Sequence, residues 1–168
     1  MTVSNATLVP TRLAHDADGR LVYFSVDSTP PLPSQNDNPW LIAVDRSDNA
    51  LRAVRHALQQ SEAIRTNTLH LIHVEPWLAK EAAEAELVRR ATDATAAARD
   101  LLDAAGHPWR LHVAMGEPAE RIIAQASELN CRCIVLGSRG LNVAQSFLFG
   151  SVAYKVLHLS PVPVLVVP

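Results

Sequence analysis

Residues 133–160 read CIVLGSRGLNVAQSFLFGSVAYKVLHLS, and this stretch determines how the rest of the chain is interpreted. It opens with a short apolar run, Cys133 to Leu136, that is typical of a strand, and it closes with a helical pattern that begins at Gly150-Ser151. Between them, three glycines and a serine follow the spacing G-x2-G-x9-G-S. Glycine lets a backbone approach an anion closely, and the free N–H groups at a helix start attract negative charge. A strand, a glycine-rich turn and a helix start in this order favour a phosphate-binding site.

Two better-known phosphate motifs are excluded. A Walker A loop needs a lysine directly after its second glycine, and this stretch has none. The dinucleotide fingerprint GxGxxG does not follow any expected strand. The spacing leaves a second interpretation open, in which the glycines only satisfy turn geometry and close helix–strand packing.

Composition is that of a soluble globular protein. The chain has 168 residues, enough for one domain with a sizeable core, and 48% of them are hydrophobic and 19% charged. Lys and Arg number 15 against 17 Asp and Glu, so the net charge of −2 gives no reason to expect nucleic acid or an anionic membrane as partner. No apolar run reaches membrane-spanning length and no export signal is visible, so a cytoplasmic location is expected. The two cysteines, separated by one residue, do not match a redox or zinc motif.

Residues 1–39 differ from the rest of the chain. Two β-leaning runs, 7–15 and 20–27, flank the turn sequence DADG and predict a hairpin, which a proline-rich linker follows. An isolated hairpin is marginal in water, so it must dock either on its own domain or on a neighbouring subunit. We therefore expect an N-terminal extension over 1–39 and one domain over 40–168.

Strand and helix patterns alternate from residue 40 onward. The expected strands are 40–44, 69–74, 110–115, 133–136 and 162–167, with a helical pattern after each of the first four. Such alternation predicts a parallel sheet with helices on both faces. Ligands of these sheets bind beyond the carboxyl ends of the strands, where the strand order reverses. Four residues fall at expected carboxyl ends, namely Asp45, Val74, Met115 and Gly137.

Six short segments in this order resemble the universal stress protein family. They are AVDRSDNALRAV (43–54), HV (73–74), MGEPAERI (115–122), IVLGSRG (134–140), FGSVAYKVL (149–157) and PVPVLVV (161–167). The resemblance covers 40–168. It implies a doubly wound, five-stranded parallel sheet of the flavodoxin-like, adenine nucleotide alpha hydrolase-like type, with strand order 3-2-1-4-5. It also implies a homodimer, which we expect to form through the apolar edge strand Val162–Val167.

One branch of this family binds ATP through G-x2-G-x9-G-[ST]. The resemblance implies that Gly137, Gly140, Gly150, Ser151 and the backbone of Val152 hold the phosphates and ribose. The segment after the second glycine carries no Lys or Arg, so the triphosphate charge must be met by amides, a nearby arginine and a divalent cation, Mg2+ or Mn2+.

The remaining implied contacts lie on the adenosine side and beside the phosphates. Asp45 would face the adenosine, the backbone of Val74 would hydrogen-bond to adenine, and Val44 and Met115 would line the base pocket. Arg139 fills a variable position of the motif and would lie along the phosphates or in solvent. Family members often have a small residue after the first-strand aspartate, whereas this chain has an arginine there.

Several of these residues also have plain structural interpretations. Asp45 would serve equally as a helix cap. Three strand histidines, His70, His73 and His112, are expected to be buried and hydrogen-bonded rather than catalytic or metal-binding, because no carboxylate or thiol stands at a ligand spacing from them. We expect an ATP-binding, stress-response regulatory dimer. A slow ATPase or self-phosphorylating enzyme, and an interaction module that binds no nucleotide, remain the alternatives.

Overall fold

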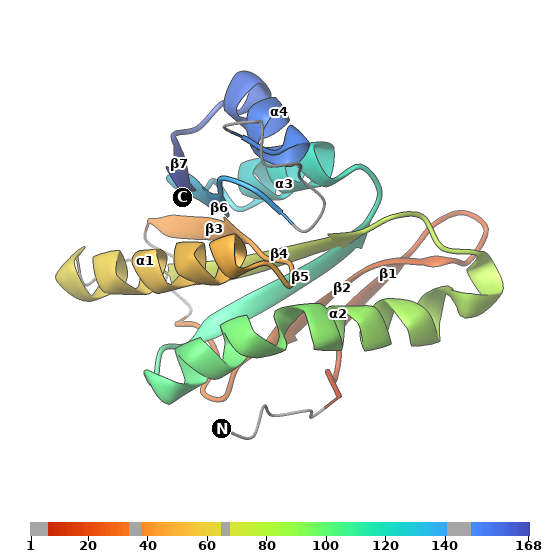
Figure 1. The fold of residues 1–168 in the computed structure, drawn as a ribbon. Coiled ribbons are helices and arrows are strands. Elements are labelled where there is room, and N and C mark those ends of the chain that lie inside the picture. Colours follow the sequence, from red (N-terminus) through yellow and green to blue (C-terminus); the bar gives the residue numbers. More distant parts are fainter. Residues whose placement is uncertain (1–6, 34–37, 65–67, 141–148) are drawn as a thin grey trace.

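The computed structural model describes residues 7–33, 38–64, 68–140 and 149–168, which form seven strands and four helices (Figure 1). The strands are β1 (Arg12–His15), β2 (Leu21–Asp27), β3 (Pro39–Ala43), β4 (Thr68–Glu75), β5 (Trp109–Met115), β6 (Cys133–Gly137) and β7 (Val164–Val167). The helices are α1 (Asp48–Ile64), α2 (Lys80–Ala104), α3 (Pro118–Glu128) and α4 (Ser151–Leu159). No helix in these ranges is long and apolar enough to cross a membrane.

All seven strands form one sheet in the order β1-β2-β5-β4-β3-β6-β7. Strands β3 to β7 are parallel to their neighbours among themselves, and in the numbering of the expected strands their order is the predicted 3-2-1-4-5. The flavodoxin-like fold class is therefore confirmed. The prediction of a five-stranded sheet is corrected to seven, because the N-terminal hairpin joins the sheet.

The hairpin docks on its own domain. Strand β2 pairs antiparallel with β5, from Tyr23 opposite Ala114 to Asp27 opposite Arg110. Its side chain Phe24 is fully buried, so the hairpin contributes to the core as well as to the ladder. Since β1 and β2 lie at the opposite edge of the sheet from β7, the second alternative, docking on a neighbouring subunit, is not needed to stabilise the hairpin.

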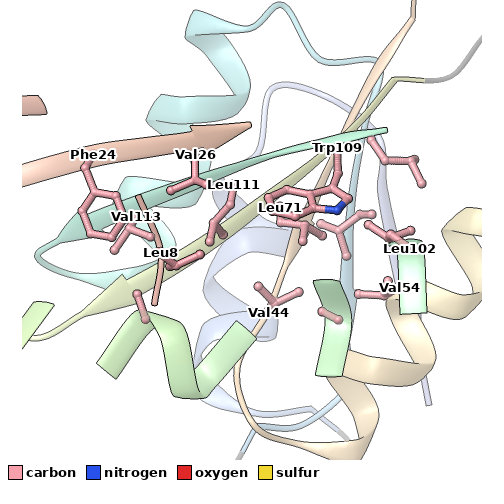
Figure 2. Close-up of a cluster of buried hydrophobic side chains, with 14 of the residues drawn as sticks. Leu8, Phe24, Val26, Val44, Val54, Leu71, Leu102, Trp109, Leu111 and Val113 are labelled. Carbon is pink, nitrogen blue, oxygen red and sulfur yellow. The ribbon is translucent and has the colours of Figure 1, made fainter. Parts of the chain in front are cut away.

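Helices cover both faces of the parallel strands (Figure 1). Helices α1 and α2 pack on one face and α3 and α4 on the other, each against its own apolar cluster. Successive residues of β3 show the alternation, because Leu41 belongs to the α3–α4 cluster and Ile42 to the α1–α2 cluster, and both are fully buried. This explains why the strand is a continuous apolar run. Figure 2 shows the α1–α2 cluster, in which hairpin residue Phe24 lies near Val113 of β5.

Two strands begin later than expected: the first run of the hairpin, expected from residue 7, forms a strand only from Arg12, and the last strand begins at Val164 rather than Val162. Ser160 forms a local turn there, since its hydroxyl donates to the Val162 carbonyl (2.8 Å) and accepts from the Val162 N–H (3.2 Å). Pro163 has no N–H for a strand ladder, although its carbonyl accepts from Ile134 (2.9 Å). The turn and the proline delay regular pairing by two residues.

Candidate functional site

The strand order reverses between β3 and β6, which are neighbours in the middle of the sheet. The helix that follows β3 packs on one face and the helix that follows β6 packs on the other. The two connections therefore diverge at the carboxyl ends of these strands, as expected at a ligand-binding switch point. The glycine-rich turn follows β6 here, and Asp45 follows β3.

Asp45 lies directly against the glycine-rich turn. Its Oδ1 accepts hydrogen bonds from the Ser47 N–H (2.8 Å) and the Ser47 hydroxyl (2.5 Å). Its Oδ2 would be 2.8 Å from a Cβ atom at Gly140, so only a glycine leaves this oxygen its present space. The capping role considered for Asp45 belongs instead to Ser47, whose hydroxyl accepts from the Ala50 N–H of α1 (3.1 Å). Asp45 thus keeps one carboxylate oxygen facing the turn.

Gly137 has a packing explanation. A Cβ atom at this position would lie 2.7 Å from the Cβ of Asn49 and 2.9 Å from the amide nitrogen of Ala50. The start of α1 therefore packs directly on the backbone of β6. For this glycine the structural interpretation left open by the sequence is sufficient.

Two amides of the turn are already used by the protein. The Ser138 N–H donates to the Val167 carbonyl (2.7 Å), and the Gly150 N–H donates to the Ser138 carbonyl (2.8 Å). Ser138 is buried, and its hydroxyl accepts from the Asn49 side chain (3.2 Å). The amides of Ser138 and Gly150 are therefore not available to an anion in this conformation. The sequence did not predict the hydrogen bond between Asn49 and Ser138, because it forms only where α1 packs against β6.

Within the described residues, the first N–H groups of α4 have no hydrogen-bond acceptor. The intrahelical bonds begin with Tyr154, whose N–H donates to Gly150 (2.9 Å), so the N–H groups of Ser151 and Val152 precede the first bond. Gly150 occupies the cap position without a side-chain bond, and the Ser151 hydroxyl is exposed rather than capping the helix. These donors lie at the positive end of the helix dipole.

Arg139 adds a further donor beside the turn. Its Nε is enclosed and has no hydrogen-bond partner within the described ranges. Most of the nine-residue interval of the motif, residues 141–148, lies outside the described residues. The donors found here are thus Arg139 Nε, the exposed Ser151 hydroxyl and the α4 amides, rather than the glycine bends themselves.

The three residues expected on the base side lie at adjacent strand ends but differ in exposure. Val44 is 5% exposed and Met115 is fully buried, with its sulfur accepting from the Leu78 N–H (3.4 Å). Both belong to the α1–α2 cluster. Val74 packs on the opposite face, against the α3–α4 cluster, and is partly exposed.

A polar link that sequence reasoning did not predict joins β3, β4 and α2. His73 Nδ1 contacts the Val44 carbonyl (2.9 Å) and its Nε2 contacts Glu75 Oε1 (2.9 Å). Arg90 of α2 approaches the other oxygen of Glu75 (3.5 Å). The hydrogen bond from His73, with a smaller contribution from Arg90, lowers the pKa of Glu75. The signal for this link was present, since residues i and i+2 of a strand share a face.

The other strand histidines confirm the prediction of buried, hydrogen-bonded side chains. His70 and His112 are 1% and 3% exposed, and they contact each other between Nδ1 and Nε2 (2.9 Å). His112 also contacts the Tyr23 hydroxyl (2.8 Å). Within the described part of the chain, no three His, Cys, Asp or Glu side chains are grouped to hold a metal ion.

Comparison with known proteins identifies the family. The universal stress protein family profile matches residues 38–168. A universal stress protein of Bacillus subtilis (strain 168), YxiE, is 30% identical over 145 residues, which are 77% of this chain and 98% of that protein. A universal stress protein of Thermus aquaticus is 33% identical over 131 residues, covering 76% of this chain and 96% of the relative.

Solved structures agree with these relatives. The universal stress protein from Archaeoglobus fulgidus in complex with dAMP has a TM-score of 0.65 and 25% identity, covering 80% of this chain and all of that one. The matched fold, the ordered motifs and the sequence relatives lead to one conclusion: this chain belongs to the universal stress protein family.

Proposed function

We propose that this protein binds an adenine nucleotide, ATP, at the carboxyl ends of β3 and β6. Two observations carry the proposal. Within the described residues, the N–H groups of Ser151 and Val152 precede the first intrahelical bond of α4, and in the turn between β6 and α4 a Cβ atom at Gly140 would lie 2.8 Å from Asp45 Oδ2. A related protein of 25% identity that is solved in complex with dAMP supports an adenine nucleotide as the ligand class.

The proposed contacts divide between two ends of the nucleotide. The phosphates take the amides of Ser151 and Val152, the Ser151 hydroxyl and Arg139, because a helix N-terminus binds anions through unbonded N–H groups. The backbone amide of Gly140 lies in the same turn. A phosphate-bound Mg2+ or Mn2+ ion supplies the remaining positive charge, and it needs no cage of protein side chains.

The adenosine half lies toward β3, β4 and β5. Asp45 Oδ2 accepts a hydrogen bond from a ribose hydroxyl, since Oδ1 already accepts the hydrogen bond of the Ser47 N–H. The Val74 backbone hydrogen-bonds to the base. The buried side chains of Val44 and Met115 line the base pocket on its core side.

We further propose that the protein is a cytoplasmic, nucleotide-dependent stress-response dimer that pairs through β7. Strand β7 is an edge strand, and carbonyls of Pro163 and Val167 point to β6. In a parallel ladder the N–H groups alternate, so those of Val164 and Val166 face the free edge. An apolar edge strand with unpaired groups is suited to pairing with a second copy.

A titration with a fluorescent ATP analogue, followed by displacement with ATP or AMP, tests nucleotide binding. Gly140→Val should abolish binding, because its side chain enters the space beside Asp45. Ala105→Val, at the exposed C-cap of α2, creates the same side chain with two added methyl groups away from the site and should bind like the wild type. Wild-type protein without affinity at millimolar Mg-ATP would refute the proposal.

The alternative of an interaction module without nucleotide has specific support. Gly137 has a packing role, and the Gly150 amide is engaged internally. Both features would be kept by a protein that uses the turn only as structure. The same titration decides between the two, since such a module leaves the analogue unbound.

A further inference from the structure

A pocket of about 400 Å3 lies at the opposite end of the sheet from the glycine-rich turn. It is lined by the N-terminal segment 7–9, the end of β2 and residues 28–30, the last turns of α2, and residues 106–109. Because Trp109 begins β5, the pocket is at the amino ends of the parallel strands. Figure 2 shows three of its lining residues, Leu8, Val26 and Trp109, as part of the α1–α2 core cluster. The pocket thus borders the core and is separate from the proposed nucleotide site.

Arg99 of α2 lines this pocket and is 7% exposed. Arginine is almost never so deeply buried unless a carboxylate pairs with it, because removing a guanidinium from water is unfavourable. No carboxylate within the described ranges forms an ion pair with Arg99. Burial lowers the pKa of this guanidinium, the charges of Asp100 and Asp103 oppose that shift, and a side chain with so high an ordinary pKa stays charged at neutral pH.

The guanidinium is held in a fixed orientation by neutral groups. Its Nε donates to the Thr95 hydroxyl (3.1 Å) and its Nη2 donates to the Thr92 carbonyl (3.1 Å). Thr95 is itself held in place, because its hydroxyl donates to the Ala91 carbonyl (2.7 Å). Arginine has five N–H donors, and within the described residues two of them are used in these bonds, which leaves further donors for a ligand.

The carboxylates on the pocket wall are engaged elsewhere. Asp103 Oδ1 accepts from the Trp109 indole N–H (2.7 Å), and Asp27 Oδ1 accepts from Arg110 (2.5 Å). Asp103 is exposed, whereas Arg99 is buried, so water screens the negative charge more strongly than the positive one. The pocket therefore contains a buried, oriented cation that no carboxylate contacts directly within the described ranges, although the charges of Asp100 and Asp103 act on it.

We propose that this pocket is a second ligand site, in which the guanidinium of Arg99 binds a small oxyanion, a carboxylate or a phosphate. A planar fork with free donors matches both groups, because each presents two oxygens at a suitable spacing. The volume lies within the range of small-molecule pockets and admits the anionic group together with further heavy atoms. The site is independent of the nucleotide at the other end of the sheet.

The indole N–H of Trp109 provides a local NMR signal for the pocket. Trp109 lines the pocket, and its indole N–H donates to Asp103, which lines it as well. The chain has three tryptophans, and Trp77 follows β4 at the carboxyl end of the sheet. In 15N-labelled full-length protein, with indole signals assigned from Trp40→Phe and Trp77→Phe, sodium phosphate and sodium acetate are titrated separately at constant ionic strength with chloride as the balancing ion. We expect the Trp109 signal to shift in a saturable way with at least one anion. Saturation by one anion alone supports the proposal and identifies its source.

Variants of Arg99 separate binding from general salt effects. Arg99→Met keeps an unbranched side chain of about the length of the arginine's aliphatic part and loses the donors, and it should weaken binding about tenfold or more. Arg55→Met removes the same charge from an exposed position of α1 and should bind like the wild type. If Arg99→Met fails to fold, Arg99→Lys keeps the charge but loses the fork, and it should also raise the dissociation constant. A Trp109 signal that does not saturate with either anion, or saturates equally in these Arg99 variants, would overturn the proposal.

Discussion

Substitution of glycine by alanine is expected to have different effects at Gly137 and at Gly140. Neither has the positive φ found at Gly19, Gly106 and Gly116, so the backbone conformation tolerates alanine at both. At Gly137 the new Cβ atom would meet backbone and Cβ atoms of α1 at 2.7–2.9 Å, and these can move only if the helix moves. Overpacking of this kind lowers the free energy of unfolding by about 1–3 kcal/mol.

At Gly140 the new Cβ atom meets a carboxylate oxygen, Asp45 Oδ2, at 2.8 Å. That oxygen is at the end of a side chain that can rotate, and alanine also restricts the unfolded chain, which favours folding by about 0.4–1 kcal/mol. We therefore expect Gly140→Ala to change the unfolding free energy by less than about 1 kcal/mol while weakening nucleotide binding.

Urea unfolding followed by circular dichroism, with the nucleotide titration on the same preparations, separates these effects. Gly137→Ala should lose stability, and Gly140→Ala should lose affinity at nearly unchanged stability. Equal stabilities of the two variants would refute the packing argument, and undiminished affinity in Gly140→Ala would refute the role of Asp45.

Three further predictions follow from contacts in the structure. Burial lowers the pKa of His70 to about 4 and of His112 to about 3, so between those values and 6.5 the unfolded chain binds more protons. The unfolding free energy should then fall by up to about 1.4 kcal/mol per histidine per pH unit below pH 6.5, and His70→Leu should reduce this slope in urea unfolding from pH 7 to 5; an unchanged slope contradicts it. Val166→Pro removes an N–H at the free edge of β7 and should convert the proposed dimer to monomer in sedimentation experiments, whereas a persistent dimer excludes β7 pairing. Arg139→Met should weaken ATP binding about tenfold, and an unaltered affinity would mean that its Nε does not face the phosphates.

The alternation of strands and helices was predictable because buried parallel strands are continuous apolar runs. Leu41 and Ile42, which face opposite clusters, illustrate why such a run identifies a strand covered on both faces. The docking of the hairpin was not predictable in the same way. Its pairing with β5 joins Tyr23 to Ala114 across 91 positions of the chain, and no local pattern specifies such a contact.

The position of the glycine-rich turn was predictable, but the hydrogen bonds of its amides were not. The spacing of glycines located the turn after β6, and strand order placed Asp45 nearby. Which amides are free depends on tertiary contacts, and the Val167 carbonyl that accepts from Ser138 belongs to a strand at the far end of the sequence. The burial of Arg99 without a contacting carboxylate was not predictable for the same reason, because helical spacing alone does not show which side chains an arginine contacts.

Residue-resolved amide exchange by NMR, with and without Mg-ATP, tests the central claim that the free first turn of α4 holds the phosphates. The account predicts slower exchange at the amides of Ser151 and Val152 on binding, and little change at Gly150, whose N–H already donates to Ser138. Unaltered amide exchange at Ser151 and Val152 in millimolar Mg-ATP would contradict it.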